Sequence, residues 1–341
     1  MKKLITALLT AMLFIAGSAY AAGTLEDADK AIANGQYAKA ITILKPLALK
    51  GNAIAQFYLG VMYDIGQGVA QDYTEALKWY KLAAAQGYAQ SQYNLGLMYS
   101  NGQGVAQDYT ETVKWFKLAA AQGDARAQFN LGIMYSNGQG VVRDYAEKLK
   151  WFKLAAAQGY AQAQYNLGNM YANGQGVGQD YVEAVKWCKL AAEQGLAVAQ
   201  YNLGIMYSSG QGVTQDGAEA VKWYKLAAAQ GDAAAQYNLG IMYDNGQGVV
   251  QDDVEAIKWY KLAAAQGDAD AQYNLGVMYA NGDGVTQDYV KALMWFDLAS
   301  AQGDKNAAEN RNLVAKKMTA KKIVQAQKLA RDCLARKYKG C

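Results

Sequence analysis

The chain lacks histidine altogether and has only one proline and three cysteines among its 341 residues. Without an imidazole, catalysis by Ser-His-Asp or Cys-His arrangements is excluded, and so is every zinc site that needs a histidine ligand. We therefore expect a protein that is not an enzyme and that holds no metal and no cofactor. Pro46, the single proline, falls late in an expected helix, which it is expected to bend.

The first residues have the three parts of a secretory signal peptide. Positive charge at 1–3 is followed by an apolar run from Leu4 to Ala16 and by the small-x-small sequence Ala19-Tyr20-Ala21. The run is too short for a comfortable membrane span, and no cysteine follows it for lipid attachment. We expect residues 1–21 to be removed and the mature protein to be periplasmic or secreted.

Tryptophan and glycine recur with a fixed period of 36 residues. The tryptophans are Trp79, Trp115, Trp151, Trp187, Trp223, Trp259 and Trp295. The glycines in the same register are Gly60, Gly96, Gly132, Gly168, Gly204, Gly240 and Gly276. A fixed period of this size is typical of a solenoid, in which each unit covers its neighbour's apolar face and none is stable alone. We expect one elongated domain with seven full repeats over 52–303.

Each repeat is expected to contain two helices. In the second repeat, the first helix should cover Ala89–Ser100 and end at Asn101-Gly102, and the second should cover Tyr109–Gln122. Asp108 is expected to cap the second helix, with Glu111 completing a capping box. The loop between them, Gly-Gln-Gly-Val, is similar to a phosphate loop, but it follows a helix instead of a strand, so its glycines are expected to serve backbone turns.

Helical periodicity predicts which side of each helix is buried. Gln92, Leu95, Gly96 and Tyr99 share one side of the first helix, where the glycine permits close approach. On the second helix the buried stripe is Tyr109, Thr112, Phe116 and Ala119, with Trp115 on its flank. Lys148 occupies an inner position that is alanine in most other repeats, so the third repeat is expected to be the loosest.

Because we expect export to an oxidising compartment, where disulfides form and persist, each of the three cysteines can be interpreted. Cys333 and Cys341 lie together at the C-terminus and are expected to form a disulfide that ties the last residues to the final helix. Cys188 stands where other repeats have Tyr80 or Phe116, so it is interpreted as a buried apolar substitute, with a reactive thiol as the less favoured alternative.

Both ends of the array are atypical, as expected for terminal repeats. Residues 22–51 are interpreted as a degenerate capping hairpin, and residues 304–341 as basic capping helices, the last from about Thr319 to Tyr338. Residues 305–341 carry a charge of about +9, whereas residues 22–304 carry about −7. The basic cap could contact an anionic envelope surface, but a solvated helix face is the favoured interpretation. Nucleic acid is not an expected partner, because no aromatic residues are interleaved for base stacking.

The repeated sequence resembles the Sel-one-like repeat (SLR) family. The shared pattern is Ala-x-Ala-Gln-Tyr-Asn-Leu-Gly-x-Met-Tyr-x-Asn-Gly-x-Gly-Val, followed by Asp, Ala, Trp and Ala-Ala at fixed offsets. The resemblance implies an all-α, right-handed α/α superhelical solenoid and a role as an adaptor in complexes of the bacterial envelope or of host contact. Some cysteine-rich members bind penicillin-like compounds or cell-wall fragments, but they have a disulfide in each repeat, which this chain lacks.

One stripe of the first helices lies opposite the buried side and is expected to line the concave surface. It carries amides that can donate and accept hydrogen bonds, flanked in most repeats by aliphatic groups, which suits an extended peptide. An equally weighted alternative is that each Asn satisfies a neighbouring helix and each aliphatic group packs on the adjacent repeat. The candidate protein-binding residues are Asn94, Leu97, Asn130, Ile133, Asn166, Asn169, Asn202, Ile205, Asn238, Ile241, Asn274 and Val277.

These patterns predict a non-enzymatic exported scaffold that binds a protein or peptide partner. The alternative is a protein that binds or hydrolyses peptidoglycan fragments or β-lactams, which would need a nucleophile or carboxylates peculiar to one repeat. Ser208-Ser209 and Asp253 break the repeat pattern in this way, but neither brings a base of the usual kind.

Overall fold

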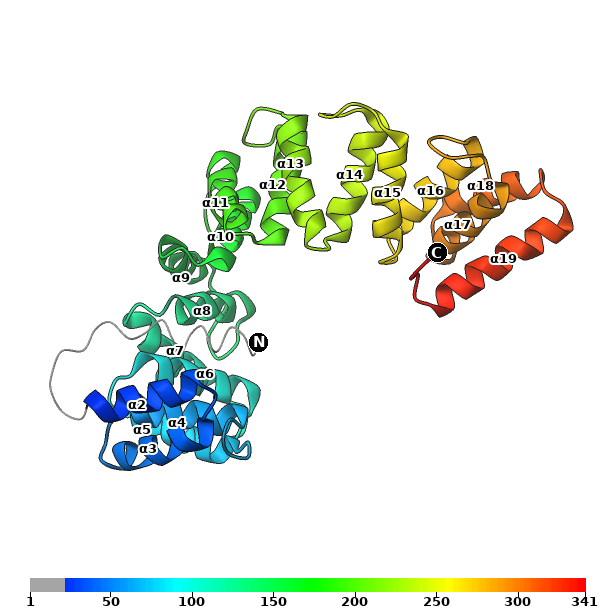
Figure 1. The fold of residues 1–341 in the computed structure, drawn as a ribbon. Coiled ribbons are helices and arrows are strands. Elements are labelled where there is room, and N and C mark those ends of the chain that lie inside the picture. Colours follow the sequence, from blue (N-terminus) through cyan, green and yellow to red (C-terminus); the bar gives the residue numbers. More distant parts are fainter. Residues whose placement is uncertain (1–21) are drawn as a thin grey trace. The chain divides into compact units, whose positions relative to one another are not determined.

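The computed structural model describes residues 22–341, with side chains from Leu25 onward, so the expected signal peptide lies outside the described residues. Within 22–341 the secondary structure consists of helices, with no strand. The helices are α2 (Ala22–Ala33), α3 (Tyr37–Leu49), α4 (Ala53–Ile65), α5 (Tyr73–Ala85), α6 (Ala89–Asn101), α7 (Tyr109–Ala121), α8 (Ala125–Asn137), α9 (Tyr145–Ala157), α10 (Ala161–Asn173), α11 (Tyr181–Glu193), α12 (Ala197–Ser209), α13 (Gly217–Ala229), α14 (Ala233–Asn245), α15 (Asp253–Ala264), α16 (Ala269–Asn281), α17 (Tyr289–Ala301), α18 (Lys305–Ala315) and α19 (Ala320–Ala335) (Figure 1).

The chain forms two compact units, one reaching Ala163 and the other starting at Gln164. Within each unit, the first helix of a repeat packs on the second helix of the same repeat, as α6 does on α7 and α14 on α15. Each second helix also packs on the next first helix, as α13 does on α14, and the first helices α14 and α16 touch directly. The prediction of an all-α solenoid built from 36-residue helix pairs is confirmed.

Helix ends follow the predicted signals. Gly102 closes α6 in the left-handed conformation, with φ of 69°. Asp108 caps α7, because its Oδ1 accepts hydrogen bonds from the backbone N–H groups of Thr110 and Glu111, at 2.8 and 3.1 Å. The side chain thereby satisfies two amides that have no partner within the helix.

The expected capping box is wrong in one of its two parts, the hydrogen bond from the Asp108 backbone N–H to the Glu111 side chain. The backbone N–H of Asp108 already donates to the carbonyl oxygen of Tyr99, at 3.0 Å, so it has no need of Glu111. The Glu111 carboxylate instead accepts hydrogen bonds from Lys114 Nζ at 2.9 Å and from Trp115 Nε1 at 3.0 Å. Glu111 therefore orients the tryptophan on the outer side of the helix.

A glycine in each first helix lets an aromatic ring or its substitute lie against the backbone. A Cβ atom at Gly96 would lie 2.4 Å from Cδ1 of Phe116, so no other residue fits without a shift. In the fourth repeat Cys188 replaces the ring, and a Cβ at Gly168 would lie 3.0 Å from the carbonyl oxygen of Ala184. The same ring contact recurs at Gly60, Gly132, Gly204, Gly240 and Gly276.

The loop glycines serve backbone turns, as predicted. Gly104 has φ of 68°, a conformation that favours glycine. A Cβ atom there would lie 2.5 Å from the carbonyl oxygen of Tyr73, at the start of the preceding second helix. The loop therefore packs closely on the N-terminal end of its neighbour.

A buried glutamine in each first helix joins three helices. Gln92 Nε2 donates to the carbonyl oxygen of Ala84 in the last turn of α5, at 3.2 Å, and Gln92 Oε1 accepts from Gln122 Nε2 just after α7, at 2.7 Å. The periodicity places Gln92 on the buried side, but it does not reveal these bonds. The same glutamine pair recurs as Gln56–Gln86, Gln128–Gln158, Gln164–Gln194, Gln200–Gln230, Gln236–Gln266 and Gln272–Gln302.

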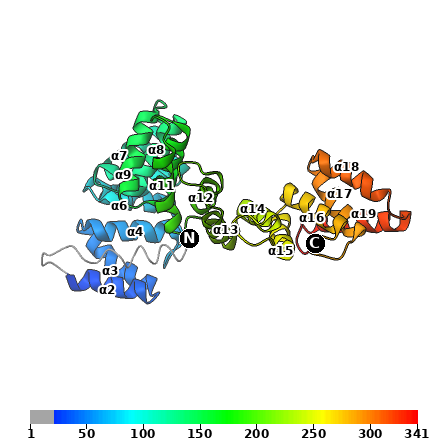
Figure 2. The ribbon, with the colours of Figure 1, turned by 90° about the horizontal axis from the view of Figure 1, so that it is seen from above.

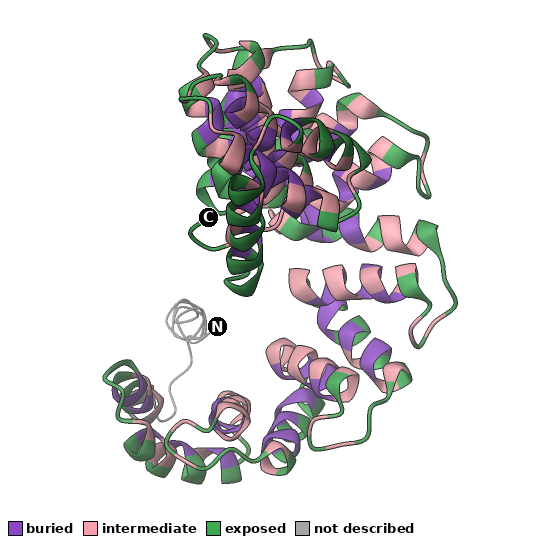
Figure 3. Cartoon of the chain, turned by 90° about the vertical axis from the view of Figure 1, so that its right-hand side faces the viewer, coloured by how far each residue is buried: buried purple, intermediate pink, exposed green. Residues whose placement is uncertain are grey.

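Buried residues lie on the facing sides of neighbouring helices (Figure 3). On α6, Gln92, Leu95 and Gly96 are buried as predicted, together with Met98. On α7, Thr112, Phe116 and Ala119 are buried. At the N-terminal end, α2 packs on α3 and α3 packs on α4, so this hairpin covers the first repeat.

Lys148 on α9 is half-buried in place of an alanine. Its Nζ lies 5.6 Å from the ring centres of Tyr145 and Phe152, and burial lowers the pKa of its ammonium group. The equivalent residue Ala256 is fully buried. The third repeat therefore carries a charged group where its relatives carry a methyl group.

We expect Lys148→Ala to stabilise the protein by about 1 kcal/mol at neutral pH, because it removes a partly desolvated charge. The folded-state pKa lies below the unfolded value, so the native state becomes less destabilised as pH rises through that folded pKa. The gain should thus shrink towards the usual lysine pKa of 10.5. Urea unfolding at several pH values measures this, and Lys150→Ala, an exposed residue paired with Glu147, is the matched control. A gain independent of pH would contradict the assigned cause.

The C-terminal cap begins like an eighth repeat and then departs from the pattern. Asp304 caps α18, and Asn310 Nδ2 donates to Tyr273 Oη at 3.2 Å, as a first helix would. The helix α19, which begins after its cap Thr319, packs instead on α17 (Figures 1 and 2). This placement leaves α19 on the outer side of the last full repeat.

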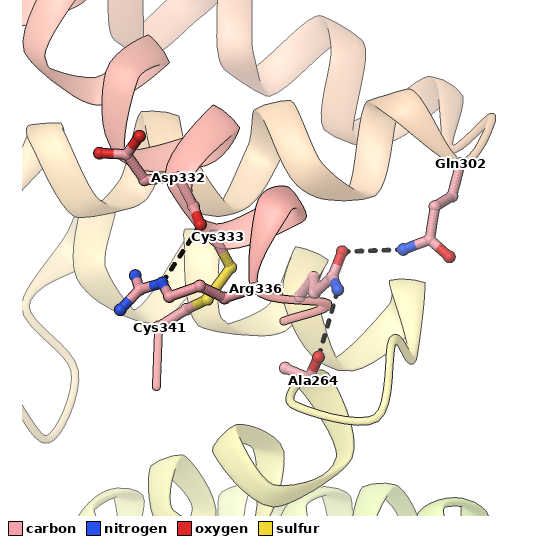
Figure 4. The surroundings of a disulfide bond; sticks show 7 residues. Ala264, Gln302, Asp332, Cys333, Arg336 and Cys341 are labelled. Atoms are coloured by element: carbon pink, nitrogen blue, oxygen red, sulfur yellow. Dashed lines mark hydrogen bonds between the residues drawn. A yellow bond between two sulfur atoms is a disulfide. The ribbon is translucent and has the colours of Figure 1, made fainter. Parts of the chain in front are cut away.

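Cys333 at the end of α19 is joined to Cys341 by a disulfide, with the two Cα atoms 5.6 Å apart (Figure 4). The backbone turns at Tyr338, which has φ of 65° and whose ring lies beside Gly267. Cys188 is a buried free thiol whose Sγ donates to the carbonyl oxygen of Ala199 at 3.2 Å, and burial raises its pKa to about 12. Cys188 therefore acts as an apolar core residue.

Candidate protein-binding face

The first-helix face is the stripe formed by the twelve candidate residues and by the aromatic residue that precedes the first asparagine of each of these helices, which is Phe129 in the third repeat and tyrosine in the others. The structure leaves all twelve candidates half-buried, where the sequence predicts an exposed stripe. The asparagines are bonded to tyrosines. Asn130 Nδ2 donates to Tyr93 Oη at 3.4 Å, and Asn202 Nδ2 donates to Tyr165 Oη at 3.2 Å.

In the second unit tyrosines and asparagines alternate from one first helix to the next as a Tyr–Asn ladder. Its hydrogen bonds are Tyr165–Asn202 and Tyr273–Asn310, each at 3.2 Å, and between them Asn238 and Asn274 lie near Tyr201 and Tyr237. Burial raises the pKa of Tyr201 and Tyr237, and the hydrogen bond from asparagine acts in the opposite direction. Both phenols are therefore neutral at physiological pH and can accept one hydrogen bond while donating another.

The aliphatic residues of the face pack on clusters formed by the second helix of their own repeat and the first helix of the next. Ile205 lies against the buried residues of α13 and α14, and Ile241 and Val277 lie against the core at the C-terminal end. In the first unit, Leu97 packs on the buried residues of α7 and α8. These contacts, like the asparagine bonds, agree with the structural role that the sequence left open. Because every residue keeps part of its surface accessible, the two roles are compatible.

The two units differ in charge along this face. Arg126 on α8 stacks 4.3 Å from the ring centre of Tyr93, and its Nη2 lies 2.6 Å from Asp124 Oδ2. The equivalent residues in the second unit are Val198, Ala234 and Asp270, of which Asp270, with Asp268, contributes to raising the pKa of Tyr237. Periodicity did not single out this position, because its residue type varies between repeats. A comparison of charges at equivalent positions would have found it.

The residues that break the repeat pattern and were considered for catalysis form hydrogen bonds within the protein. The Ser209 hydroxyl donates to the carbonyl oxygen of Ile205 at 2.8 Å, and Ser208 makes a similar bond at 3.3 Å, as serines in helices commonly do. Asp253 Oδ1 accepts from Gln251 Nε2 at 3.3 Å. Between residues 22 and 341, no three His, Cys, Asp or Glu side chains gather as metal ligands. None of the helices in that range is long and apolar enough to span a membrane.

Comparisons with known proteins agree with this architecture. A family model described as Sel1 repeat matches residues 53–88, 89–124, 125–160, 161–196, 197–232, 233–268 and 269–304. The crystal structure of a Sel1 repeat protein from Oxalobacter formigenes is 35% identical, with a TM-score of 0.64, over 89% of this chain and 98% of that one. A protective antigen of uropathogenic Escherichia coli strains that displays an SLR fold is 34% identical, with a TM-score of 0.44, over 89% of this chain and 81% of that one. No curated protein matches the chain.

Proposed function

Because the chain belongs to the Sel1 repeat family, whose members generally mediate protein–protein interaction, we propose that it is a non-enzymatic, exported scaffold that binds a protein or peptide on its first-helix face. The Tyr–Asn ladder of the second unit is the observation that carries this proposal. It offers hydroxyl and amide groups at each repeat, beside the half-buried aliphatic residues Ile205, Ile241 and Val277. An extended peptide presents backbone amides and carbonyls that such groups can bind.

Charge favours a basic segment in the second unit. Asp232, Asp268 and Asp270 lie near Tyr201 and Tyr237, and each contributes to raising the pKa of one or both phenols. A peptide with lysine or arginine beside its backbone contacts would gain from these carboxylates. We place the partner among envelope or host-contact proteins, in line with the expected export.

Site-specific photo-crosslinking tests the proposal. A photoreactive phenylalanine analogue at Tyr237 should crosslink envelope proteins, whereas the same analogue at Leu226, on the outer side of α13, should not. Replacing Asn202 and Asn238 with alanine should reduce capture by Tyr237 without changing helical content, because one bond per repeat is lost while the core remains. Equal crosslinking from both positions, or undiminished capture by the double variant, would remove the first-helix face from consideration.

The export proposal has its own test. Protein isolated from its native source should begin at Ala22, and mass spectrometry should find Cys333 and Cys341 without free thiols. Cys188 should resist alkylation until the protein unfolds, because its buried thiol has a pKa of about 12. An intact N-terminus with two reactive C-terminal thiols would place the protein in a reducing compartment.

A further inference from the structure

The second helices carry a row of leucines on their outer side, and one member of the row differs from the others. Leu82, Leu118, Leu154, Leu190, Leu226 and Leu262 are between 39% and 44% exposed. The seventh member, Leu298 on α17, is fully buried, at 0%. The cause lies in the same chain, because α19 packs on α17. The outer side of a second helix can therefore receive another helix.

The docked helix shows what such a partner requires. On α19 the buried residues are Ala326, Ala330 and Cys333, and Ile323 is half-buried one turn earlier. Their spacing, i, i+3, i+7 and i+10, is that of a heptad stripe about 15 Å long. Two of the four residues are alanine, which lets the helix axes approach closely. On the outer side of α19, Lys321, Lys328 and Arg331 are exposed beside the apolar residue Val324.

The equivalent groove one repeat earlier is open. It has a volume of about 500 Å³ and is lined by Val254, Ile257, Lys258, Lys261 and Leu262 from α15, and by Gly284 and Val285 from the next loop. Thirty-six residues later these α15 positions are Val290, Leu293, Met294, Asp297 and Leu298, of which Leu293, Met294 and Leu298 are buried in the core that includes α19. An opening at the first repeat has only Lys78 and Leu82 at positions equivalent to this lining and otherwise faces the preceding helices α3 and α4.

Charge distinguishes the open groove from the occupied one. In the first six repeats two lysines flank the outer leucine, as Lys258 and Lys261 flank Leu262. In the seventh repeat the same positions are Met294 and Asp297, and Asp297 lies 3.8 Å from Arg311. In the sixth repeat Lys258 already lies 3.0 Å from Glu255, so Lys261 supplies the excess positive charge beside Leu262. A helix that enters the open groove would therefore gain from carboxylates beside its apolar stripe.

We propose that the groove on α15 at the sixth repeat is a docking site for an acidic amphipathic helix of a partner protein. Its apolar stripe matches the i, i+3, i+7, i+10 spacing of α19, and its flanking carboxylates pair with Lys258 and Lys261. This site is separate from the first-helix face, so the scaffold would hold two partners, or two parts of one partner, on different sides of the second unit. The mode of binding is the one that α19 already uses on α17.

A dye at the rim of the groove tests the proposal. Val254 is 65% exposed, so Val254→Cys in the oxidised mature chain provides a single reactive thiol, since Cys188 is buried and the other two cysteines are bonded. The probes are two helix-stapled peptides with the α19 apolar spacing, one flanked by glutamates and the other by lysines. The glutamate peptide should saturate the dye signal and bind about ten-fold more tightly than the lysine peptide.

Three variants decide the outcome. Leu262→Gln should weaken binding of the glutamate peptide about ten-fold, whereas Leu226→Gln in the fifth repeat should leave the signal at the sixth unchanged. Replacing Lys258 and Lys261 with glutamate should reverse the peptide preference. The proposal is overturned if the glutamate peptide gives no saturable signal, if Leu262→Gln binds it normally, or if the dye responds to protein concentration alone, which would make a second copy of the chain the occupant.

Discussion

Replacing Gly240 with alanine should destabilise the second unit by about 3 kcal/mol, near the upper end of the range typical for adding a methyl group to a well-packed core. The added Cβ would lie 2.4 Å from Cδ1 and Cε1 of the Tyr260 ring, which is itself fully buried. The ring cannot retreat without disturbing its hydrogen bond to Asp244 Oδ2, at 3.2 Å. Equilibrium unfolding in urea, followed by circular dichroism, measures the loss.

Gly178 provides the matched control for this substitution. It lies in the loop of the fourth repeat, and an added Cβ there would meet no atom within 4 Å. Gly178→Ala should therefore leave the unfolding midpoint almost unchanged. If the two variants had equal stability, the ring contact would not explain the recurrence of glycine in the first helices.

Replacing Gln236 with methionine, a side chain of similar length, should cost about 2 kcal/mol, because it removes two buried hydrogen bonds between helices. Gln236 Nε2 donates to the carbonyl oxygen of Ala228 at 3.2 Å, and Gln236 Oε1 accepts from Gln266 Nε2 at 2.9 Å. Gln266 would keep its bond to the carbonyl oxygen of Gly231 at 3.0 Å, and the carbonyl oxygen of Ala228 would keep its bond from the Gly231 N–H at 3.0 Å, so the cost is that of the two lost bonds. Thermal and urea unfolding both report this loss.

The exposed loop residue Gln247 is the corresponding control, since Gln247→Met changes a glutamine that lies on the surface. Hydrogen exchange adds a local measurement. Amides near the junction of α13 and α14 should exchange faster in Gln236→Met, because in a repeat array each interface depends on its immediate neighbours. Uniform protection across that junction would show that the glutamine contributes little to the interface.

Local sequence signals predicted the helices well. The glycine that ends α6, the aspartate that caps α7 and the glycine facing Phe116 each act through atoms a few residues away or one helix apart within the same repeat. The partner of Glu111 was not predictable in this way. The competing bond from the Asp108 amide to Tyr99 depends on how the loop returns between two helices, which no periodicity encodes.

The sequence placed the candidate residues on one stripe, but it did not predict which groups surround them. Helical periodicity put Asn202 and Asn238 on one stripe, yet their tyrosine partners come from the preceding repeat, at a distance set by packing between repeats. The docking of α19 on α17 was likewise not predictable from the sequence. The apolar stripe of α19 predicted that one side of this helix is buried. Which helix covers that side depends on the short connection from α18 and on the replacement of lysine by Met294.

The specialised seventh repeat also constrains how this array can change in length. A unit such as 197–232 could be duplicated by recombination, because both of its ends present surfaces that its neighbours already recognise. A duplicated 269–304 placed inside the array would have no terminal helix over Met294 and Leu298 and would expose both to water. Gain and loss of units should therefore occur upstream of Ala269, and shorter or longer natural variants should retain the sequence from Ala269 to Cys341 as one inherited block.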